Sequence, residues 1–81
     1  MNPRVGQFFH SFHDEDHTEM NWQGKILKQA SPGKYRVQLL EWVSGEPSIE
    51  KVVSAEEMTD WKFYDTRSEW LAAYAEFKKR S

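Results

Sequence analysis

Five short stretches with the composition of β-strands divide most of the 81-residue chain, and an amphipathic helical pattern follows the last of them. The stretches are rich in aromatic and β-branched residues and are separated by polar or Gly- and Pro-containing segments, as consecutive strands are. The fourth and fifth are joined by Ser54-Ala55-Glu56-Glu57, whose capping-box spacing predicts a single helical turn, with Met58 filling the core after it. This order predicts a small, mainly β domain with a C-terminal helix.

The chain length allows one compact core but no deep substrate cavity beside it, so we expect a single domain over residues 1–81 that is not an enzyme. Hydrophobic residues make up 38% of the chain and include five Phe, four Trp and three Tyr, which favours an aromatic-rich core. The absence of cysteine excludes disulfides and thiolate zinc sites and fits a reducing cytoplasm. No run of 18 apolar residues occurs, so we expect a cytoplasmic protein without membrane contact and without a cofactor.

The hairpin formed by the second and third strands is the most clearly marked local structure. Strand-like sequence covers residues 5–12, 22–30, 35–42, 49–53 and 60–64. In Ser31-Pro32-Gly33-Lys34, proline sets φ at the first central position and glycine accepts a positive φ at the second, which is typical of a tight turn. A two-residue loop then predicts the interior pairs Ala30–Tyr35, Lys28–Val37, Ile26–Leu39, Gly24–Glu41 and Trp22–Val43.

The opposite face of this hairpin leaves Leu27, Leu40 and Trp42 uncovered, and the C-terminal segment is the candidate cover. Thr66 and Glu69 have capping-box spacing, and apolar residues after them recur at helical intervals. These residues are Trp70, Ala73, Tyr74 and Phe77, with Leu71 beside them. We expect this helix to pack on the strands, although the same helix face is equally suited to self-association with a second copy.

The strand order and the turn before the last strand resemble Tudor domains and other SH3-like β-barrels. This resemblance implies a five-stranded barrel at about 4–64, with the C-terminal helix at about 67–80 packed on it. Three blocks are also similar to short uncharacterised bacterial proteins, including some on plasmids or other mobile elements. The blocks are Gly6–Phe12, Tyr35–Trp42 and Asp60–Asp65. The second resemblance spans most of the chain and implies no established activity.

Tudor-type barrels typically bind methylated lysine or arginine through cation–π attraction, in an aromatic cage near the loops that join strands one to two and three to four. The resemblance therefore implies an aromatic ligand site in this chain. Its rings are Phe12, Trp22 and Trp42, and Glu41 and Glu46 add favourable charge. The predicted register offers a competing interpretation, because it assigns Trp22 to the core and Trp42 to the surface beneath the helix.

Basic residues on the central hairpin suggest a second function, nucleic-acid binding, which SH3-like barrels of ribosomal and transcription factors also perform. They are Lys25, Lys28, Lys34 and Arg36, and aromatic neighbours of such residues can stack on bases. The net charge of −2 opposes this interpretation, as does the register, which divides the four side chains between two faces. A solvated hairpin tip is the alternative explanation.

Imidazole and carboxylate groups, which are ligands of zinc and other transition metals, gather at the end of the first strand. They are His10, His13 and His17, with Asp14, Glu15 and Asp16 between them. Their spacing matches no motif with a known mechanism, and a polar loop organises ligands poorly. Neither a glycine-rich phosphate loop nor a nucleophile triad can be assembled from the sequence.

We therefore predict a protein-interaction module whose barrel and helix form a rigid scaffold. Its partner is expected to be a protein or peptide that contacts exposed aromatic residues, because Trp and Tyr are common anchors in such contacts. Nucleic-acid binding through the basic hairpin and metal binding through the histidine loop are the alternatives.

Overall fold

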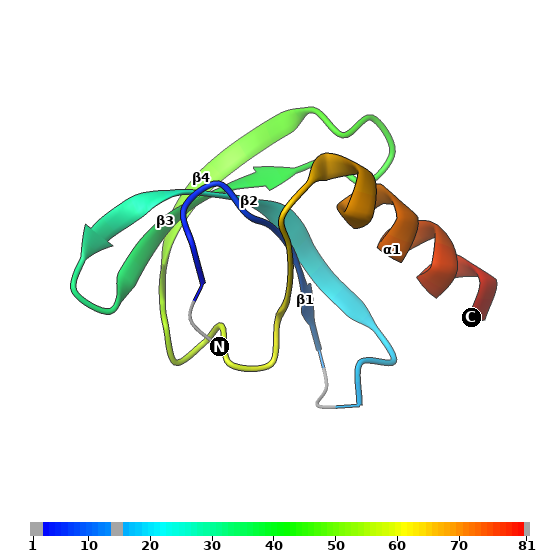
Figure 1. Cartoon of the computed structure of the whole chain (residues 1–81), viewed down its shortest axis with the longest axis horizontal. Coiled ribbons are helices and arrows are strands. Elements are labelled where there is room, and N and C mark those ends of the chain that lie inside the picture. The colour runs from blue at the N-terminus through cyan, green and yellow to red at the C-terminus, as the bar shows by residue number, and fades with distance from the viewer. Residues whose placement is uncertain (1–2, 14–15, 81) are drawn as a thin grey trace.

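Five antiparallel strands form one sheet, and an α-helix follows them (Figure 1). The structure is a computed structural model that describes residues 3–13 and 16–80. The elements are β1 (Phe8–Phe12), β2 (Met20–Ser31), β3 (Lys34–Leu40), β4 (Pro47–Ser54), β5 (Lys62–Tyr64) and α1 (Arg67–Arg80). The predicted order of five strands and a C-terminal helix is confirmed.

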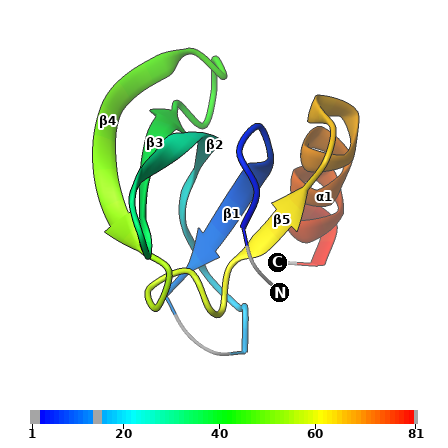
Figure 2. The same ribbon diagram turned by 60° about the vertical axis from the view of Figure 1, so that its left-hand side comes forward.

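The sheet is open at both edges. Its strand order is β4-β3-β2-β1-β5, so β4 and β5 are the edge strands. Within the described residues no pairing joins these two strands, and the expected closed barrel is therefore not shown. Figure 2 shows a strongly curved sheet with β4 and β5 on opposite sides of it. The shortness of β5 contributes to this openness, because three residues offer few hydrogen bonds to a second neighbouring strand.

The turn of the β2–β3 hairpin has the predicted form. Gly33 has a φ of 76°, and Ser31 pairs with Lys34 across the two-residue loop. The carbonyl of Gly33 also accepts a hydrogen bond of 2.9 Å from the N–H of Ala55, which ties the hairpin tip to the end of β4. Local turn chemistry therefore determines where this hairpin reverses.

The register of the hairpin differs from the prediction, because β2 contains two irregularities. They fall between Ile26 and Lys28 and between Gln29 and Ser31, so Leu27 and Ala30 are extra residues in β2. The observed pairs are Gln29–Tyr35, Lys28–Arg36, Ile26–Val37, Lys25–Gln38 and Gly24–Leu39. Four residues predicted to face the interior are exposed, namely Lys28, Ala30, Glu41 and Val43.

The main hydrophobic core lies on one side of the sheet. Its buried residues are Phe9, Ile26, Val37, Leu39, Val53 and Met58, and partly buried Trp22, Tyr35, Trp61 and Phe63 pack against them. Phe9 and Trp61 stack with ring centroids 4.7 Å apart. Aromatic rings from β1, β2, β3 and β5 thus supply much of the burial, as the composition predicts.

Tight turns over residues 55–60 replace the predicted helical turn before β5. The N–H of Glu57 donates to the carbonyl of Ser54 and that of Met58 to the carbonyl of Ala55, so these bonds span three residues. Bonds of this span wind the backbone more tightly than the four-residue bonds of an α-helix do, so the segment is a series of tight turns and not an α-helical turn. The Ser54 hydroxyl still bonds the N–H and carboxylate of Glu57, and Met58 is buried in the core as predicted.

The start of α1 is fixed by the predicted capping box. The Thr66 hydroxyl accepts a hydrogen bond from the N–H of Glu69 and donates one to its carboxylate, each 3.1 Å long. The helix contacts β1 and β5, as Figure 2 also shows. No helix in the described part of the chain is long and apolar enough to cross a membrane.

The apolar side of α1 packs on the sheet face opposite to the main core. Trp70 is 1% exposed and stacks on Phe8 with ring centroids 5.2 Å apart. Tyr74 contacts Trp42, so the helix covers this tryptophan as predicted, while Leu27 stays partly exposed. The helix is therefore packed within its own chain.

Candidate functional site

Aromatic side chains from the sheet and the helix gather around His10. Residues 8, 10 and 12 of β1 alternate with the core residue Phe9 and so point toward α1. The His10 ring lies 6.1 Å from Trp42, 5.9 Å from Trp70 and 6.2 Å from Tyr74, measured between ring centroids. His10 is fully buried there, so it acts as part of the support beneath the surface aromatic residues.

The polar atoms of this cluster are only partly paired. Nδ1 of His10 and the hydroxyl of Tyr64 share a hydrogen bond of 3.0 Å. Nε2 of His10 and Nε1 of Trp70 are buried without a hydrogen-bond partner among the described residues. Burial lowers the pKa of His10 to about 4 and raises the pKa of Tyr64 to about 12. Both side chains are therefore neutral at physiological pH.

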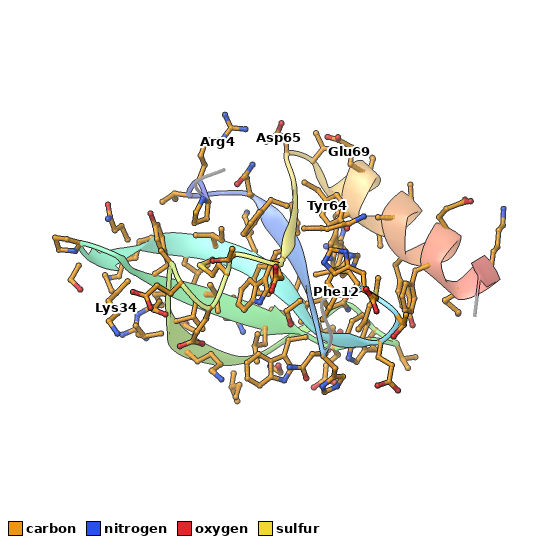
Figure 3. The ribbon with its side chains drawn as sticks, turned by 90° about the horizontal axis from the view of Figure 1, so that it is seen from below. Arg4, Phe12, Lys34, Tyr64, Asp65 and Glu69 are labelled. Atoms are coloured by element: carbon orange, nitrogen blue, oxygen red, sulfur yellow. The ribbon has the colours of Figure 1, made fainter. Side chains whose placement is uncertain are left out.

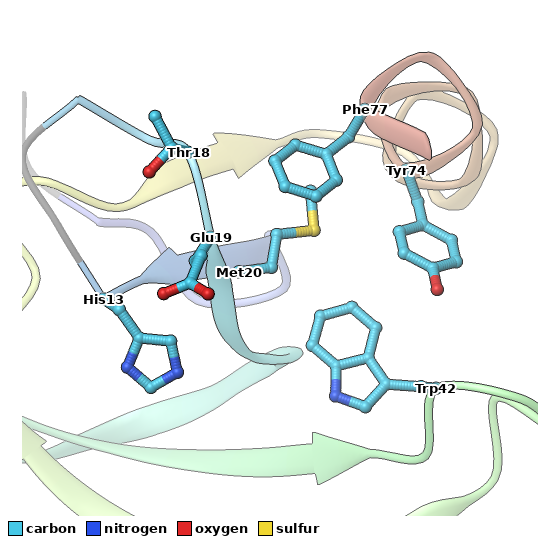
Figure 4. Close-up of a pocket in the computed structure, with 7 residues that line it drawn as sticks. All are labelled: His13, Thr18, Glu19, Met20, Trp42, Tyr74 and Phe77. Carbon is cyan, nitrogen blue, oxygen red and sulfur yellow. The ribbon is translucent and has the colours of Figure 1, made fainter. Parts of the chain in front are cut away.

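A pocket of about 490 Å³ opens beside this cluster, between the C-terminal half of α1 and the β1–β2 loop (Figure 4). It is lined by His13, Thr18, Glu19, Met20, Trp42, Tyr74 and Phe77. In Figure 4 the Trp42 ring lies opposite Phe77 and beside Tyr74, and Glu19 lies on the other side of Met20. The three rings are half-buried and keep exposed surface, and the described lining contains one carboxylate and no lysine or arginine.

The turn between β3 and β4 positions Trp42. The N–H of Glu41 donates to the carbonyl of Glu46 over 2.8 Å, and the N–H of Gly45 donates to the carbonyl of Glu41 over 3.0 Å. The side-chain amide of Gln23 on β2 also donates to the Glu41 carbonyl, at 3.0 Å. These bonds fix the backbone of the turn, so Trp42 enters the pocket from a well-defined position.

The β1–β2 loop brings the other side of the pocket into place. The N–H of His13 donates to the carbonyl of Glu19 over 2.9 Å, which closes the loop. His17 stacks on Phe12 with ring centroids 4.2 Å apart, and its Nε2–H donates a 2.8 Å hydrogen bond to the carbonyl of Asp60. These contacts hold His17 at a φ of 59°, which is uncommon for a non-glycine residue.

The structure separates the three rings of the predicted aromatic ligand site. Trp42 lines the pocket, whereas Phe12 lies beneath Phe77, with ring centroids 6.4 Å apart. Trp22 lies on the opposite face of the sheet and packs against the core, where the Nζ of Lys51 is 3.5 Å from its ring centroid. The three rings therefore do not form one cage, because Trp22 and Trp42 point to different faces.

Of the three rings of the pocket, only Trp42 belongs to the ligand site predicted from the sequence, and the carboxylate of the pocket, Glu19, does not. Tyr74 and Phe77 were predicted as packing residues of the helix, and both also line the pocket. Glu41 and Glu46 lie outside the lining, and Glu19 is the carboxylate within it. The acidic composition of the β1–β2 loop is the one sequence signal for Glu19, and the contact of this loop with α1 is not visible in the sequence.

The four basic residues of the predicted nucleic-acid site are spread along the β2–β3 hairpin. Lys28 lies opposite Arg36 in the backbone pairing of β2 and β3. The guanidinium of Arg36 forms an ion pair of 3.4 Å with the carboxylate of Glu50. Lys25 places its Nζ 5.4 Å from the centroid of the Phe8 ring. Lys34 lies at the hairpin tip, at the end of the molecule away from α1 (Figure 3). Lys25 and Arg36 thus have contacts within the chain, and the four residues do not form one compact basic surface.

The three histidines of the predicted metal site lie in different surroundings. His10 is buried beneath α1, His13 is exposed at the pocket, and His17 is bonded to the Asp60 carbonyl. Among the described residues no group of three His, Cys, Asp or Glu side chains is placed to hold a metal ion. Asp14 and Glu15 lie outside the described residues, whereas Asp16 is described and exposed.

Comparison with known proteins gives no match to a family model, a curated protein or a solved structure. The functional interpretation therefore rests on the pocket itself.

Proposed function

We propose that the chain is a non-enzymatic interaction module that binds a positively charged side chain of a partner protein or peptide in the pocket between α1 and the β1–β2 loop. The observation that carries this proposal is the pocket lining. Half-exposed rings of Trp42, Tyr74 and Phe77 line one side of the pocket, and the Glu19 carboxylate lies at another side of it. A cation over such a ring gains about 0.5–2 kcal/mol, and a nearby carboxylate favours the same charge.

Lysines of the chain already make contacts of this kind. Lys51 places its Nζ 3.5 Å from the centroid of Trp22, and Lys78 places its Nζ 5.4 Å from that of Tyr74. These distances are within the range of about 6 Å over which an ammonium is attracted to a ring face. The Lys51 contact supports the proposal, because the ligand would make the same contact over rings that retain exposed surface. Lys78 already lies near Tyr74, so Trp42 and Phe77 are the rings that we expect the ligand cation to contact.

The direct test is an NMR titration of the 15N-labelled chain with three small probes. They are Nα-acetyl-lysine amide with a free ε-amine, the same compound with a trimethylated ε-amine, and Nα-acetyl-norleucine amide, which lacks the amine. We expect the two cationic probes to shift the indole N–H of Trp42 and the amides of Tyr74 and Phe77. Norleucine should produce much smaller shifts, because it gains neither cation–π attraction nor the Glu19 charge. Equal shifts with norleucine, or none with any probe, would contradict a cation-binding pocket.

Two carboxylate variants separate the local effect from the overall charge. Glu19→Gln should weaken binding of the cationic probes by about 3- to 10-fold, since it removes the charge at the pocket. Glu46→Gln makes the same change at an exposed carboxylate outside the lining, and it should leave the affinity unchanged. An equal loss in both variants would indicate non-specific attraction to an acidic protein.

We also infer that the sheet is an open relative of the SH3-like, Tudor-like barrel. The antiparallel order β4-β3-β2-β1-β5 and the tight turns before the last strand support this assignment. The pocket proposed here uses Tyr74 and Phe77 of a C-terminal helix that the minimal Tudor module lacks. Bacterial origin, association with mobile elements and a cytoplasmic location stay predictions from the sequence.

A further inference from the structure

A second pocket of about 190 Å³ adjoins the first and shares two of its lining residues. Met20 and Phe77 line both pockets, so their side chains form the partition between them. The second pocket continues from this partition toward β5 and the middle of α1. Its remaining lining residues are Phe12, His17, Lys62, Tyr64, Ala73 and Glu76.

The second pocket differs from the first in its chemistry. Phe12 and Ala73 give it half-buried apolar walls, and Lys62 and Glu76 are exposed residues of opposite charge in its lining. A charged ligand group in this pocket would meet one charge of its own sign and one of the opposite sign, so the lining favours neither charge. An uncharged apolar side chain gains from removing apolar surface at Phe12 and Ala73 from water.

We propose that the two pockets together bind one extended peptide segment, with a lysine or arginine side chain in the first pocket and an aliphatic side chain in the second. This inference rests on the function proposed for the first pocket. Side chains on the same side of an extended peptide recur at every second residue, roughly 7 Å apart. Because Met20 and Phe77 line both pockets, the pockets are immediate neighbours, and the recognised motif therefore places the two residues at positions i and i+2.

The test uses five-residue peptides and the full chain, with affinity measured by NMR titration. The core sequences are Lys-Ser-Leu and Leu-Ser-Lys, since either direction of the peptide is compatible with the pockets. Three reference peptides accompany them. The lysine-only peptide has serine in place of leucine, the second has serine in place of lysine, and the third has leucine directly after lysine. One of the two core peptides should bind about tenfold more tightly than the lysine-only peptide, because it also buries the leucine. Its shifts should extend to Tyr64 and Ala73.

A pair of helix variants tests the location of the second contact. Ala73 lines the second pocket, so the larger side chain of Ala73→Leu should fill it. This variant should abolish the tenfold gain in affinity that leucine gives the peptide, and it should bind the lysine-only peptide with unchanged affinity. Ala75→Leu makes the same change at an exposed position of α1 that lines neither pocket, and it should leave the gain intact.

The outcomes distinguish this inference from the function on which it rests. If the lysine-only peptide binds and leucine does not increase the affinity, the two-pocket motif is wrong and the cation pocket stands. The same conclusion follows if leucine directly after lysine increases the affinity as much as leucine two positions away. If no lysine-containing peptide binds, the cation pocket itself is wrong. A gain that requires the i and i+2 spacing and disappears in Ala73→Leu supports both.

Discussion

His10 is the most buried of the three histidines, because α1 and the Trp42 turn close over it. The sequence places it in a strand between Phe8 and Phe12, and that alternation alone indicates that it shares a buried face with two aromatic rings. The sequence does not reveal what covers this face. The metal interpretation treated His10 as an accessible ligand, whereas the fold makes it a packing residue.

The burial of His10 predicts a loss of stability in mild acid. Its pKa falls from 6.5 in the unfolded chain to about 4 in the fold, and burial is the main cause. Between these values the unfolded chain binds a proton that the folded chain does not, so stability is greatest above pH 6.5 and falls as the pH drops toward 4. The expected loss at His10 is about 2–3 kcal/mol at pH 4.5.

Urea unfolding of wild-type protein and His10→Phe at pH 7 and pH 4.5 measures this contribution. The variant should lose about 2–3 kcal/mol less than the wild type between the two pH values, because its phenyl ring takes up no proton. Carboxylates such as Asp65 are present in both proteins, so their contribution cancels. His13→Gln removes an exposed histidine and should keep the wild-type pH dependence. An equal loss in wild type and His10→Phe would contradict the assignment.

At the scale of the elements, the sequence predicted what depends on local chemistry. The Pro32-Gly33 turn and the Thr66 capping box both form as expected, since each rests on residues a few positions apart. The hairpin register was predicted wrongly because Leu27 and Ala30 are extra residues in β2. Simple alternation assumes one partner per residue, and nothing about Leu27 or Ala30 marks them as an exception.

Strand β2 also contains a close backbone contact that predicts a strongly destabilising substitution. A Cβ atom at Gly24 would overlap the carbonyl oxygen of Gln38 on β3 and would lie 3.0 Å from a ring atom of Phe9. Backbone atoms inside a paired sheet have little freedom to move away. Gly24→Ala is therefore expected to lower the free energy of unfolding by about 2–4 kcal/mol, measured by urea denaturation.

Gly33→Ala is the matched control for Gly24→Ala. The space around Gly33 is open, but its positive φ of 76° is strained for alanine, at a cost of about 1–2 kcal/mol. Gly24→Ala should therefore be clearly more destabilising than Gly33→Ala. The reverse order would mean that β2 and β3 can separate at Gly24 more easily than their pairing indicates.

At the scale of the whole molecule, the candidate site depends on contacts between residues far apart in the chain. Glu19 and Met20 meet Tyr74 and Phe77 only because α1 packs beside the β1–β2 loop. The sequence predicted that the helix would pack on the strands and cover Trp42, and this is confirmed. It did not predict the space left between helix and loop, because that space depends on the angle at which α1 crosses the sheet.

The same packing predicts that α1 and the sheet unfold together. Trp70 is 1% exposed and stacks on Phe8 and His10, so Trp70→Ala should cost about 3–5 kcal/mol. At about 0.05–0.15 kcal/mol per residue, a chain of this length has a total stability of roughly 4–12 kcal/mol. If α1 and the sheet unfold together, Trp70→Ala should lower the denaturation midpoint by the same amount in two measurements. These are the helical circular dichroism signal and the NMR signals of Ile26 and Val37, which lie on the other side of the sheet.

Leu71→Ala changes the next helix residue, whose side chain is 49% exposed, and should cost less than about 1 kcal/mol. Two denaturation midpoints for Trp70→Ala, with the helix signal lost first while Ile26 and Val37 keep their native signals, would contradict a single cooperative unit. In that case α1 could detach from an intact sheet, and both pockets would depend on its docking. Coincident midpoints would instead mean that the pockets are present whenever the sheet is folded, because α1 and the sheet that line them form together.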